Sequence, residues 1–460
     1  MAGIGFGLRR LIHQGNLSGL FGGYLFSALI TAGPWLFTIL SLGSIVLFGN
    51  QLLSPDELSR FRLVIIYNFS LSLVLSGPLT IVVTRYISDK VYQRDIREIP
   101  GILMGSLGFL LVVQLPFVLY FYLSHLTLPL EISLAATANY LLISAIWLVS
   151  VFLSALKDYA TISLNFALGM ALGVLLGVHF GDTHSVSGAL TGFNIGLGFI
   201  LFSLIARVMV ENPYPATGFF GFFSYFKKYW DLAVCGLCYN LAIWVDKWIM
   251  WLAPEAEEML TGFISYPHYE TAMFLAFLTI IPAMSIFFVN VETSFYEKYM
   301  LFYKDIQNHA PYDKIQLNQG EITRNLLDNS RLLIFFQGFI SFMAIVLAPR
   351  LFDALNINYL LLGMFRIGVL GAFFHVMTMF MFIILFYFDF RKPALGLHIL
   401  FLASNIVFTL MSLKAGFSYY GYGYFFASLL TFGCTYCFTF HAVGTLPYRA
   451  FIKNNSALSG

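Results

Sequence analysis

The sequence has few charged residues. Aspartate, glutamate, lysine and arginine make up 10% of its 460 residues, whereas about a quarter of the residues of a soluble protein are charged. Hydrophobic residues make up 59% of the chain, and its mean hydropathy is +0.80. These proportions exclude a soluble globular protein and predict an integral membrane protein.

Cysteine is also scarce. The four cysteines form two CxxC pairs, Cys235 with Cys238 and Cys434 with Cys437. In a soluble chain this spacing would indicate zinc binding or redox chemistry. Here both pairs lie in apolar segments with almost no charge nearby, so we interpret them as small packing residues and expect no metal site.

Nucleotide-binding and catalytic motifs are missing from the sequence. It contains no GxxxxGK[ST], HExxH or GxSxG pattern. His375 stands alone in an aromatic-rich segment, and we interpret it as a packed, hydrogen-bonded side chain. A membrane acyltransferase or glycosyltransferase is the enzyme alternative, and His375 is the one feature that supports it. We expect no catalytic residue, no cofactor and, at a net charge of +2, no nucleic-acid partner.

Twelve apolar runs are long enough to cross a bilayer as helices, which takes about 20 residues. We therefore predict an all-α integral membrane protein with about 12 transmembrane helices, preceded by a short amphipathic segment at 1–16 that lies on the membrane surface. The approximate limits of the helices are 17–48, 63–86, 101–123, 132–156, 159–180, 186–210, 231–252, 271–296, 332–348, 359–388, 394–413 and 421–446.

The lysines and arginines are unevenly distributed among the loops. If the N-terminus is cytoplasmic, the inside segments contain 19 of the 25, the outside segments contain four, and Lys247 and Arg366 lie within the membrane. Positive charge accumulates in the cytoplasmic loops of membrane proteins. We therefore predict that both termini are cytoplasmic.

The two halves of the chain show a faint repeat. Pro78 in the second predicted helix corresponds to Pro282 in the eighth, and Trp35 in the first corresponds to Trp244 in the seventh, at offsets of 204 and 209 residues. Repeats of this kind are common in secondary transporters. We predict an N-terminal six-helix lobe at 1–210, a cytoplasmic linker at 211–230 and a C-terminal six-helix lobe at 231–460.

The seventh predicted helix contains Asp246 and Lys247. Each charge costs roughly 2.5 to 3.5 kcal/mol at the centre of a bilayer, so such residues normally face protein or water. On a helical wheel Lys247 shares a stripe with Trp244, whereas Asp246 lies about 200° from Trp244, so the two charges need not share a partner. We interpret both as candidates for a transport pathway; the alternative for Lys247 is that it extends to the lipid headgroups.

A third membrane charge, Arg366, lies in the tenth predicted helix. A buried guanidinium needs a counter-charge or carbonyl groups, and Asp246 is the candidate. We therefore hypothesise an Asp246–Arg366 ion pair in the second lobe.

A tyrosine followed by an asparagine occurs in both halves, as Tyr67 with Asn68 and as Tyr239 with Asn240. Tyrosine and tryptophan on a wet inner surface bind sugar rings without fixing one register, because each has an apolar body and a polar tip. We interpret these four residues, with Trp244, as pathway candidates. The alternative is that the asparagines form hydrogen bonds between helices.

Three prolines mark expected bends in the helices around this pathway, Pro34, Pro78 and Pro282. We expect an aqueous groove lined by the first, second, seventh and eighth helices. Alternating access and a continuous path for the substrate both fit this arrangement.

Glycines recur at helical spacing in the fifth and sixth predicted helices. Such faces let two helix backbones approach closely in lipid. We predict tight packing within the first lobe, with sliding or bending of these smooth faces as the alternative. The glycines are Gly169, Gly173, Gly177 and Gly181 in the fifth helix and Gly188, Gly192 and Gly196 in the sixth.

Four stretches resemble a known family. They are the opening MAGIGFGLRRLI, the run GGYLFSALITAGPWLFTILSLG, the WVDKW of the seventh helix and the long loop after the eighth. They are similar to the PelG family, the inner-membrane transporters of the Pel exopolysaccharide system, in the polysaccharide-transporter branch of the multidrug/oligosaccharidyl-lipid/polysaccharide (MOP) superfamily. The resemblance covers nearly the whole chain.

This resemblance implies export of a growing, N-acetylhexosamine-rich polysaccharide across the bacterial inner membrane, through a central pathway between two lobes. It also implies a cytoplasmic glycosyltransferase and a membrane partner that responds to cyclic di-GMP. The alternative is a lipid-linked oligosaccharide flippase of the same superfamily, some of which carry extra helices that this chain lacks. A drug antiporter would usually have a carboxylate in an early helix, and the first helix has none.

Overall fold

We analysed a computed structural model of the chain, and the description covers residues 33–34, 36–49, 53–155, 158–259 and 261–448. The predicted surface segment at 1–16, Trp35 and both termini lie outside the described residues. The cytoplasmic placing of the termini therefore stays a prediction.

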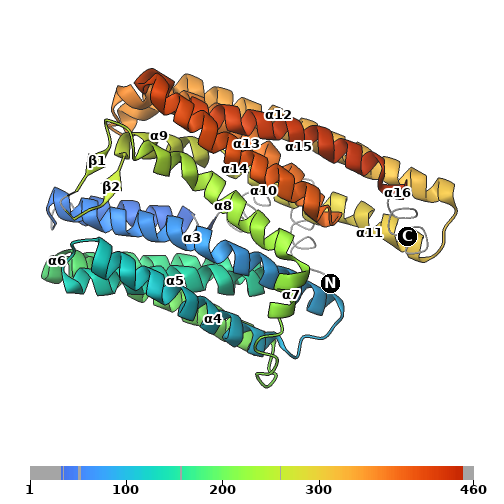
Figure 1. Cartoon of the computed structure of the whole chain (residues 1–460), viewed down its shortest axis with the longest axis horizontal. Helices are drawn as coiled ribbons and strands as arrows, with labels where there is room; N and C mark the ends of the chain where they lie inside the picture. The colour runs from blue at the N-terminus through green and yellow to red at the C-terminus, as the bar shows by residue number, and fades with distance from the viewer. Residues whose placement is uncertain (1–32, 35, 50–52, 156–157, 260, 449–460) are drawn as a thin grey trace, which may run out of the picture. The chain divides into compact units, whose positions relative to one another are not determined.

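The chain divides into two compact units (Figure 1). The N-terminal unit comprises the described residues of Leu29–Trp244 and Trp251–Tyr266, and the C-terminal unit comprises Val245–Met250 and those of Pro267–Gly460. One helix, α8 (Trp230–Met250), contributes residues to both. The lobe boundaries at 210 and 231 stay a prediction.

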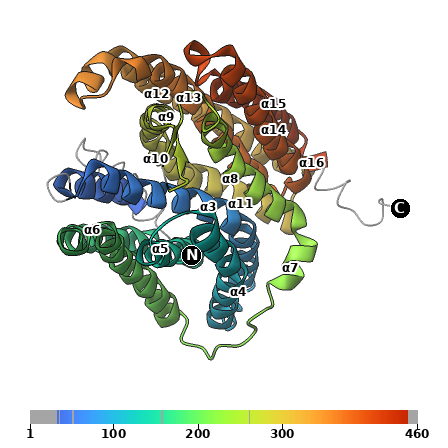
Figure 2. The ribbon, with the colours of Figure 1, turned by 60° about the vertical axis from the view of Figure 1, so that its left-hand side comes forward.

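The N-terminal unit is a bundle of long helices. Within it α5 packs against both α3 and α6 (Figure 2). The helix α3 begins with a capping box, in which the Ser54 hydroxyl accepts from the Glu57 N–H and the Glu57 carboxylate accepts from the Ser54 N–H. The elements before α8 are Leu36–Gly49, α3 (Pro55–Tyr92), α4 (Ile99–Tyr120), the π-helical η1 (Phe121–His125), α5 (Leu130–Ala155), α6 (Tyr159–Glu211) and α7 (Phe223–Lys228).

The element α6 is a helical hairpin and not one rod. His184 and Ser185 have non-helical dihedral angles, and the chain folds back at this point. A Cβ at Gly196 would lie 2.4 Å from the carbonyl oxygen of Gly169, so the two halves pack backbone to backbone. This packing agrees with the one predicted from the glycine spacing, and the halves correspond to the fifth and sixth predicted helices.

The C-terminal unit is also helical. Its helix α15 packs against both α13 and α14 (Figure 1). Between α8 and these helices, a two-stranded antiparallel hairpin of β1 (Glu257–Glu258) with β2 (Ile264–Ser265) belongs to the N-terminal unit. After it come α9 (Pro267–Leu278), α10 (Ile281–Asn290), η2 (Val291–Phe295), α11 (Tyr296–Gln307), α12 (Tyr312–Ala354), η3 (Tyr359–Leu361), α13 (Leu362–Tyr387), α14 (Arg391–Ala415), η4 (Phe417–Tyr419), α15 (Tyr422–Gly444) and α16 (Leu446–Tyr448).

Ten helices of the described chain are long and apolar enough to cross a membrane. This number counts the α6 hairpin once and leaves out the shorter apolar helix Leu36–Gly49. With both taken into account, each of the twelve predicted spans corresponds to a helical segment. The prediction of an all-α, multi-pass membrane protein is therefore confirmed.

One predicted loop is a helix. The sequence predicts a long aqueous loop at 297–331, after the eighth span. In the structure these residues form α11 and the first half of α12. The reason is a buried stripe, Ile315, Ile322, Leu326 and Leu333, at helical spacing within a charged sequence. The ion pairs Lys298–Glu321 and Lys314–Asp305 join α11 to α12.

The cysteine pairs lie in different surroundings. Cys235 and Cys238 are buried, whereas Cys434 and Cys437 are exposed. The packing interpretation is therefore wrong for the second pair, because α15 buries another face, which includes Thr431, Thr435 and Thr439.

Candidate functional site

The charged pair on α8 is buried in the C-terminal unit. The Asp246 side chain is 0% exposed, and the Lys247 side chain is 14% exposed. The Lys247 Nζ lies 3.0 and 3.1 Å from the two carboxylate oxygens, and the Tyr269 hydroxyl donates to Oδ2 at 3.0 Å. Because a lone charge is costly in this setting, these bonds are what allow the carboxylate to be buried here.

Hydrogen bonds and ring contacts extend from this pair to α13 and α15. The Lys247 ammonium lies 5.5 Å from the centre of the Tyr424 ring, and the Tyr424 hydroxyl is 2.9 Å from His375 Nδ1. Asp246, Lys247, Tyr269, Tyr424 and His375 thus form one polar cluster, which we call the charged cluster. It joins α8, α9, α13 and α15.

The hypothesised Asp246–Arg366 ion pair is wrong. Asp246 binds Lys247 and Tyr269 and forms no ion pair with Arg366, whose buried Nε has no hydrogen-bond partner among the described residues. The two neighbouring charges pair with each other, because the long lysine side chain folds back onto the preceding carboxylate. A helical wheel gives only the direction of each Cβ, so it does not show that the flexible lysine side chain can bend back to the preceding residue.

An aromatic stack lies in the N-terminal unit, beside the β-hairpin. The rings of Tyr67 and Trp251 are 4.6 Å apart and nearly parallel, at 12°, and the Phe263 ring meets Tyr67 edge-on at 5.0 Å. The Tyr67 hydroxyl donates to the carbonyl oxygen of Ile264 at 2.6 Å. This stack holds a predicted pathway residue, Tyr67, in a fixed orientation.

The N-terminal part of α8 packs closely on α3. The Asn240 amide donates to the Leu73 carbonyl oxygen at 2.9 Å, and a Cβ at Gly77 would lie 3.1 Å from the carbonyl oxygen of Gly236. Tyr239 is half-buried. Trp244 is half-buried too, and its indole Nε1 is a buried donor with no partner among the described residues.

Asn68 belongs to a buried hydrogen-bond network between helices. Its amide donates to Asn139 Oδ1 at 2.9 Å, and it accepts from the Tyr122 hydroxyl at 2.6 Å. Asn139 in turn donates to Asn194 at 2.7 Å. These bonds fit the alternative interpretation of Asn68 as a residue that joins helices, and its pathway role stays a prediction.

The prolines lie at different kinds of position. Pro78 is inside α3, which runs without interruption, and Pro282 is in the first turn of α10, just after α9 ends at Leu278. Pro34 is helical. Their role as bends around a pathway stays a prediction.

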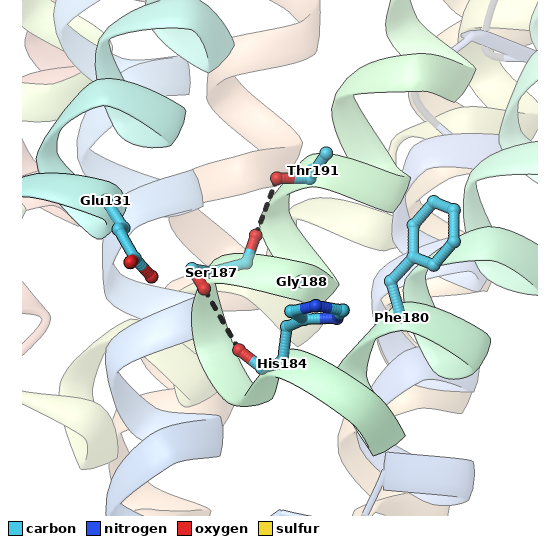
Figure 3. A pocket seen from close by; sticks show the side chains of 6 residues that line it. All are labelled: Glu131, Phe180, His184, Ser187, Gly188 and Thr191. Carbon is cyan, nitrogen blue, oxygen red and sulfur yellow. Dashed lines mark hydrogen bonds between the residues drawn. The ribbon is translucent and has the colours of Figure 1, made fainter.

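A cavity of about 360 Å³ lies where α5 begins and α6 folds back (Figure 3). Ser185, in the bend, has φ +58° and ψ −142°, a strained conformation for serine, and its hydroxyl bonds the Glu57 carboxylate. A carboxylate, hydroxyl groups and an aromatic ring are groups that bind sugars. The lining residues are Glu131, Phe180, His184, Ser187, Gly188 and Thr191.

Several residues of these clusters are not among the site residues predicted from the sequence. Tyr269 and Tyr424 are two of 26 tyrosines, and no local pattern distinguishes them from packing residues. Asn139 and Asn194 had a usable signal, since an amide inside an apolar span requires a partner. No group of three or more histidines, cysteines, aspartates or glutamates that could hold a metal occurs in the described chain.

One protein family matches the sequence. Its model, described as "PelG: Putative exopolysaccharide Exporter (EPS-E)", covers residues 1–451. A search of curated proteins found no match.

Solved structures of MOP superfamily transporters are similar in fold. An outward-facing multidrug resistance MATE family transporter aligns with a TM-score of 0.68 and 13% identity, over 96% of this chain and 99% of that chain. A MOP superfamily transporter from Pyrococcus furiosus whose binding pocket has reverse polarity aligns with a TM-score of 0.63 and 13% identity, over 95% of this chain and 98% of that chain. A MATE protein in its bent conformation aligns with a TM-score of 0.64 and 12% identity, over 97% of this chain and 99% of that chain. At these identities the likeness concerns the fold alone.

Proposed function

Because this chain belongs to the PelG family of exopolysaccharide exporters and has the fold of MOP superfamily transporters, we propose that it moves a growing, N-acetylhexosamine-rich polysaccharide across the bacterial inner membrane. The observation that carries the proposal is the family match along residues 1–451. The match confirms the resemblance found in the sequence, and it makes the chain a transporter and not an enzyme. The identity of the sugar and the inner membrane as its location belong to the proposal.

The polar and aromatic residues inside the units support a route for a sugar chain. In the N-terminal unit, the half-buried Trp251 ring stacks on the buried Tyr67 ring, and the buried indole Nε1 of Trp244 is a donor with no partner among the described residues. Tyr239 and Asn240 lie on the same helix as Trp244. In the C-terminal unit we assign pathway roles to Asp246, Lys247 and Arg366.

The cavity beside Glu131 suits a single sugar unit in size and chemistry. A carboxylate accepts hydrogen bonds from hydroxyl or amino groups, and the Phe180 ring offers an apolar face. We propose that this cavity contacts the polymer at one end of its route.

Two partners are part of the proposal. A polymer that grows while it is exported requires a glycosyltransferase on the cytoplasmic side, and the resemblance to the family adds a membrane partner that responds to cyclic di-GMP. Alternating access and a continuous path both fit the fold. A long polymer favours the continuous path, because it cannot be enclosed whole.

Deletion of the gene in the native host tests the proposal. We expect secreted hexosamine polymer to disappear, to return when the wild-type gene is restored, and no lipid-linked repeat to accumulate in the membrane. Accumulation of lipid-linked repeats in the deletion strain would identify a flippase. Unchanged polymer secretion would overturn both functions.

A further inference from the structure

We infer that the segment of residues 214–230, which connects α6 to α8 and includes the first residue of α8, binds anionic phospholipids at the membrane surface. We call it the anchor segment, and Figure 2 shows it running from α6 past one end of α4 to α7. Its fixed position on α4, its outward phenylalanines and its adjacent lysines support this binding. The binding does not depend on what the chain exports.

Two glycines of α4 fix the main chain of the anchor segment. A Cβ at Gly101 would lie 1.8 Å from the carbonyl oxygen of Thr217, and a Cβ at Gly105 would lie 1.8 Å from that of Phe219. Gly218 between them has φ +71°, a conformation that side chains other than glycine rarely adopt. The segment is therefore held at one height along α4 and is not a loosely attached loop.

With the start of α4 taken as the membrane surface, this height corresponds to the boundary between lipid headgroups and acyl chains. Gly105 is six residues after Ile99, the first residue of α4, which is about 9 Å along a helix axis. The Phe223 ring lies further along, 4.9 Å from the Phe109 ring. Interfacial segments bury their apolar faces about 5 to 10 Å into this boundary.

One phenylalanine of the anchor segment points into the N-terminal unit and three are exposed on its surface. Phe222 is fully buried, whereas Phe219, Phe220 and Phe223 are 41%, 59% and 40% exposed. Trp230, at the end of the segment, is 56% exposed. The three outward rings lie within six residues, and nothing in the N-terminal unit covers them fully.

Two exposed lysines, Lys227 and Lys228, follow these rings directly. The Lys228 ammonium lies 5.0 Å from the centre of the Tyr229 ring. Other charged residues nearby form ion pairs within the unit: Arg85 pairs with Asp89, and Lys90 pairs with Asp95 and Glu98. No carboxylate is recorded within bonding distance of Lys227 in the described chain.

A lipid surface fits this combination better than a protein partner. The outward rings lie along the side of α4, a helix apolar enough to span the membrane, at a depth where acyl chains begin. Lysines placed beside aromatic rings at such a boundary meet the phosphate headgroups. Lysines near the surface are also attracted to the anionic lipids of the cytoplasmic leaflet, and this end of α4 is predicted to be cytoplasmic.

Tryptophan quenching by brominated lipids tests the inference. The full chain is placed in nanodiscs that contain brominated phosphatidylglycerol or, at equal mole fraction, brominated phosphatidylcholine. The difference between wild type and Trp230→Phe isolates the Trp230 signal. We expect stronger quenching by phosphatidylglycerol, and a preference that falls roughly fivefold for each of Lys227→Gln and Lys228→Gln.

Lys392→Gln is the matched control, because Lys392 is exposed, predicted to be cytoplasmic, and part of the C-terminal unit. Equal quenching by both lipids, unchanged in the lysine variants, would overturn the preference for anionic lipids. Absence of Trp230 quenching by either lipid would overturn the inference altogether and would leave the segment facing water.

Discussion

At the scale of single residues, the charged cluster places a buried ion pair inside the C-terminal unit. Asp246 is tolerated inside the unit because Lys247 and Tyr269 satisfy both of its oxygens. The sequence predicts that these charges matter, because ionisable residues inside a span are rare and functional. It does not predict their partners, because side-chain direction depends on the packing of α9 and α15 around α8.

Replacing Asp246 by asparagine should destabilise the protein by about 3 kcal/mol, because the change leaves the Lys247 ammonium buried without its counter-charge. The unfolding temperature in detergent would measure the loss. The double variant Asp246→Asn, Lys247→Met removes both charges and should recover most of the stability.

Secreted polymer, assayed in the same variants, separates stability from transport. We expect polymer output to stay low in the double variant, because the proposed pathway role requires the charges themselves. A double variant that is stable and exports normally would show that the pair has a structural role alone.

At the scale of elements, the α6 hairpin depends on glycine contacts. A Cβ at Gly196 would lie 2.4 Å from the Gly169 oxygen and 2.7 Å from the Gly173 Cα. Gly196→Ala should therefore separate the two halves and cost about 1 to 3 kcal/mol, as measured by thermal unfolding. Gly198→Ala, two residues away, has no atom within 4 Å of the new Cβ.

The control variant should be neutral or slightly more stable, because alanine favours a helix by about 0.5 to 1 kcal/mol over glycine. Equal stability of Gly196→Ala and Gly198→Ala would contradict the close packing of the hairpin.

The turn between α3 and α4 should respond to acid. Hydrogen bonds from Lys90 and then from Tyr86, each of 2.8 Å, hold the pKa of Glu98 below its usual range. This stabilisation is present above the ordinary carboxyl pKa of about 4.3 and is lost as pH falls through the lowered folded-state pKa. Because the Glu98 side chain is 34% exposed, solvent screening limits the effect to below about 1 kcal/mol.

Glu98→Gln should lower the unfolding temperature by about 1 °C or less at neutral pH and should approach wild type in acid. Glu257→Gln, at an exposed site on β1, is the control. A Glu98→Gln difference that persists unchanged at low pH would rule out the carboxylate as its source.

The sequence predicts the helices well and their ends less well. Long apolar runs such as 101–123 identify α4 directly, and the glycine spacing identifies the packing of α6. The first half of α12 was missed because Ile315, Ile322 and Leu326 are spread through a charged segment that reads as a loop. The β-hairpin after α8 was missed because its two-residue strands have no periodicity.

At the scale of the whole molecule, fold and family are established by different observations. Solved MOP superfamily transporters share the fold at 12 to 13% identity, so the fold persists while most side chains differ. Membership of the exopolysaccharide exporter family follows from the match along residues 1–451. The pathway residues remain a proposal, because the fold is shared by transporters of other substrates.

Polymer translocation itself is the most direct test of the proposed function. Inside-out vesicles from producing cells would receive labelled sugar nucleotide, and an added glycoside hydrolase would then digest all polymer left outside. We predict that labelled polymer is protected in vesicles that contain this chain and digested in vesicles that lack it. Protection of short lipid-linked saccharides alone, with long polymer digested in both, would contradict export of a growing polysaccharide.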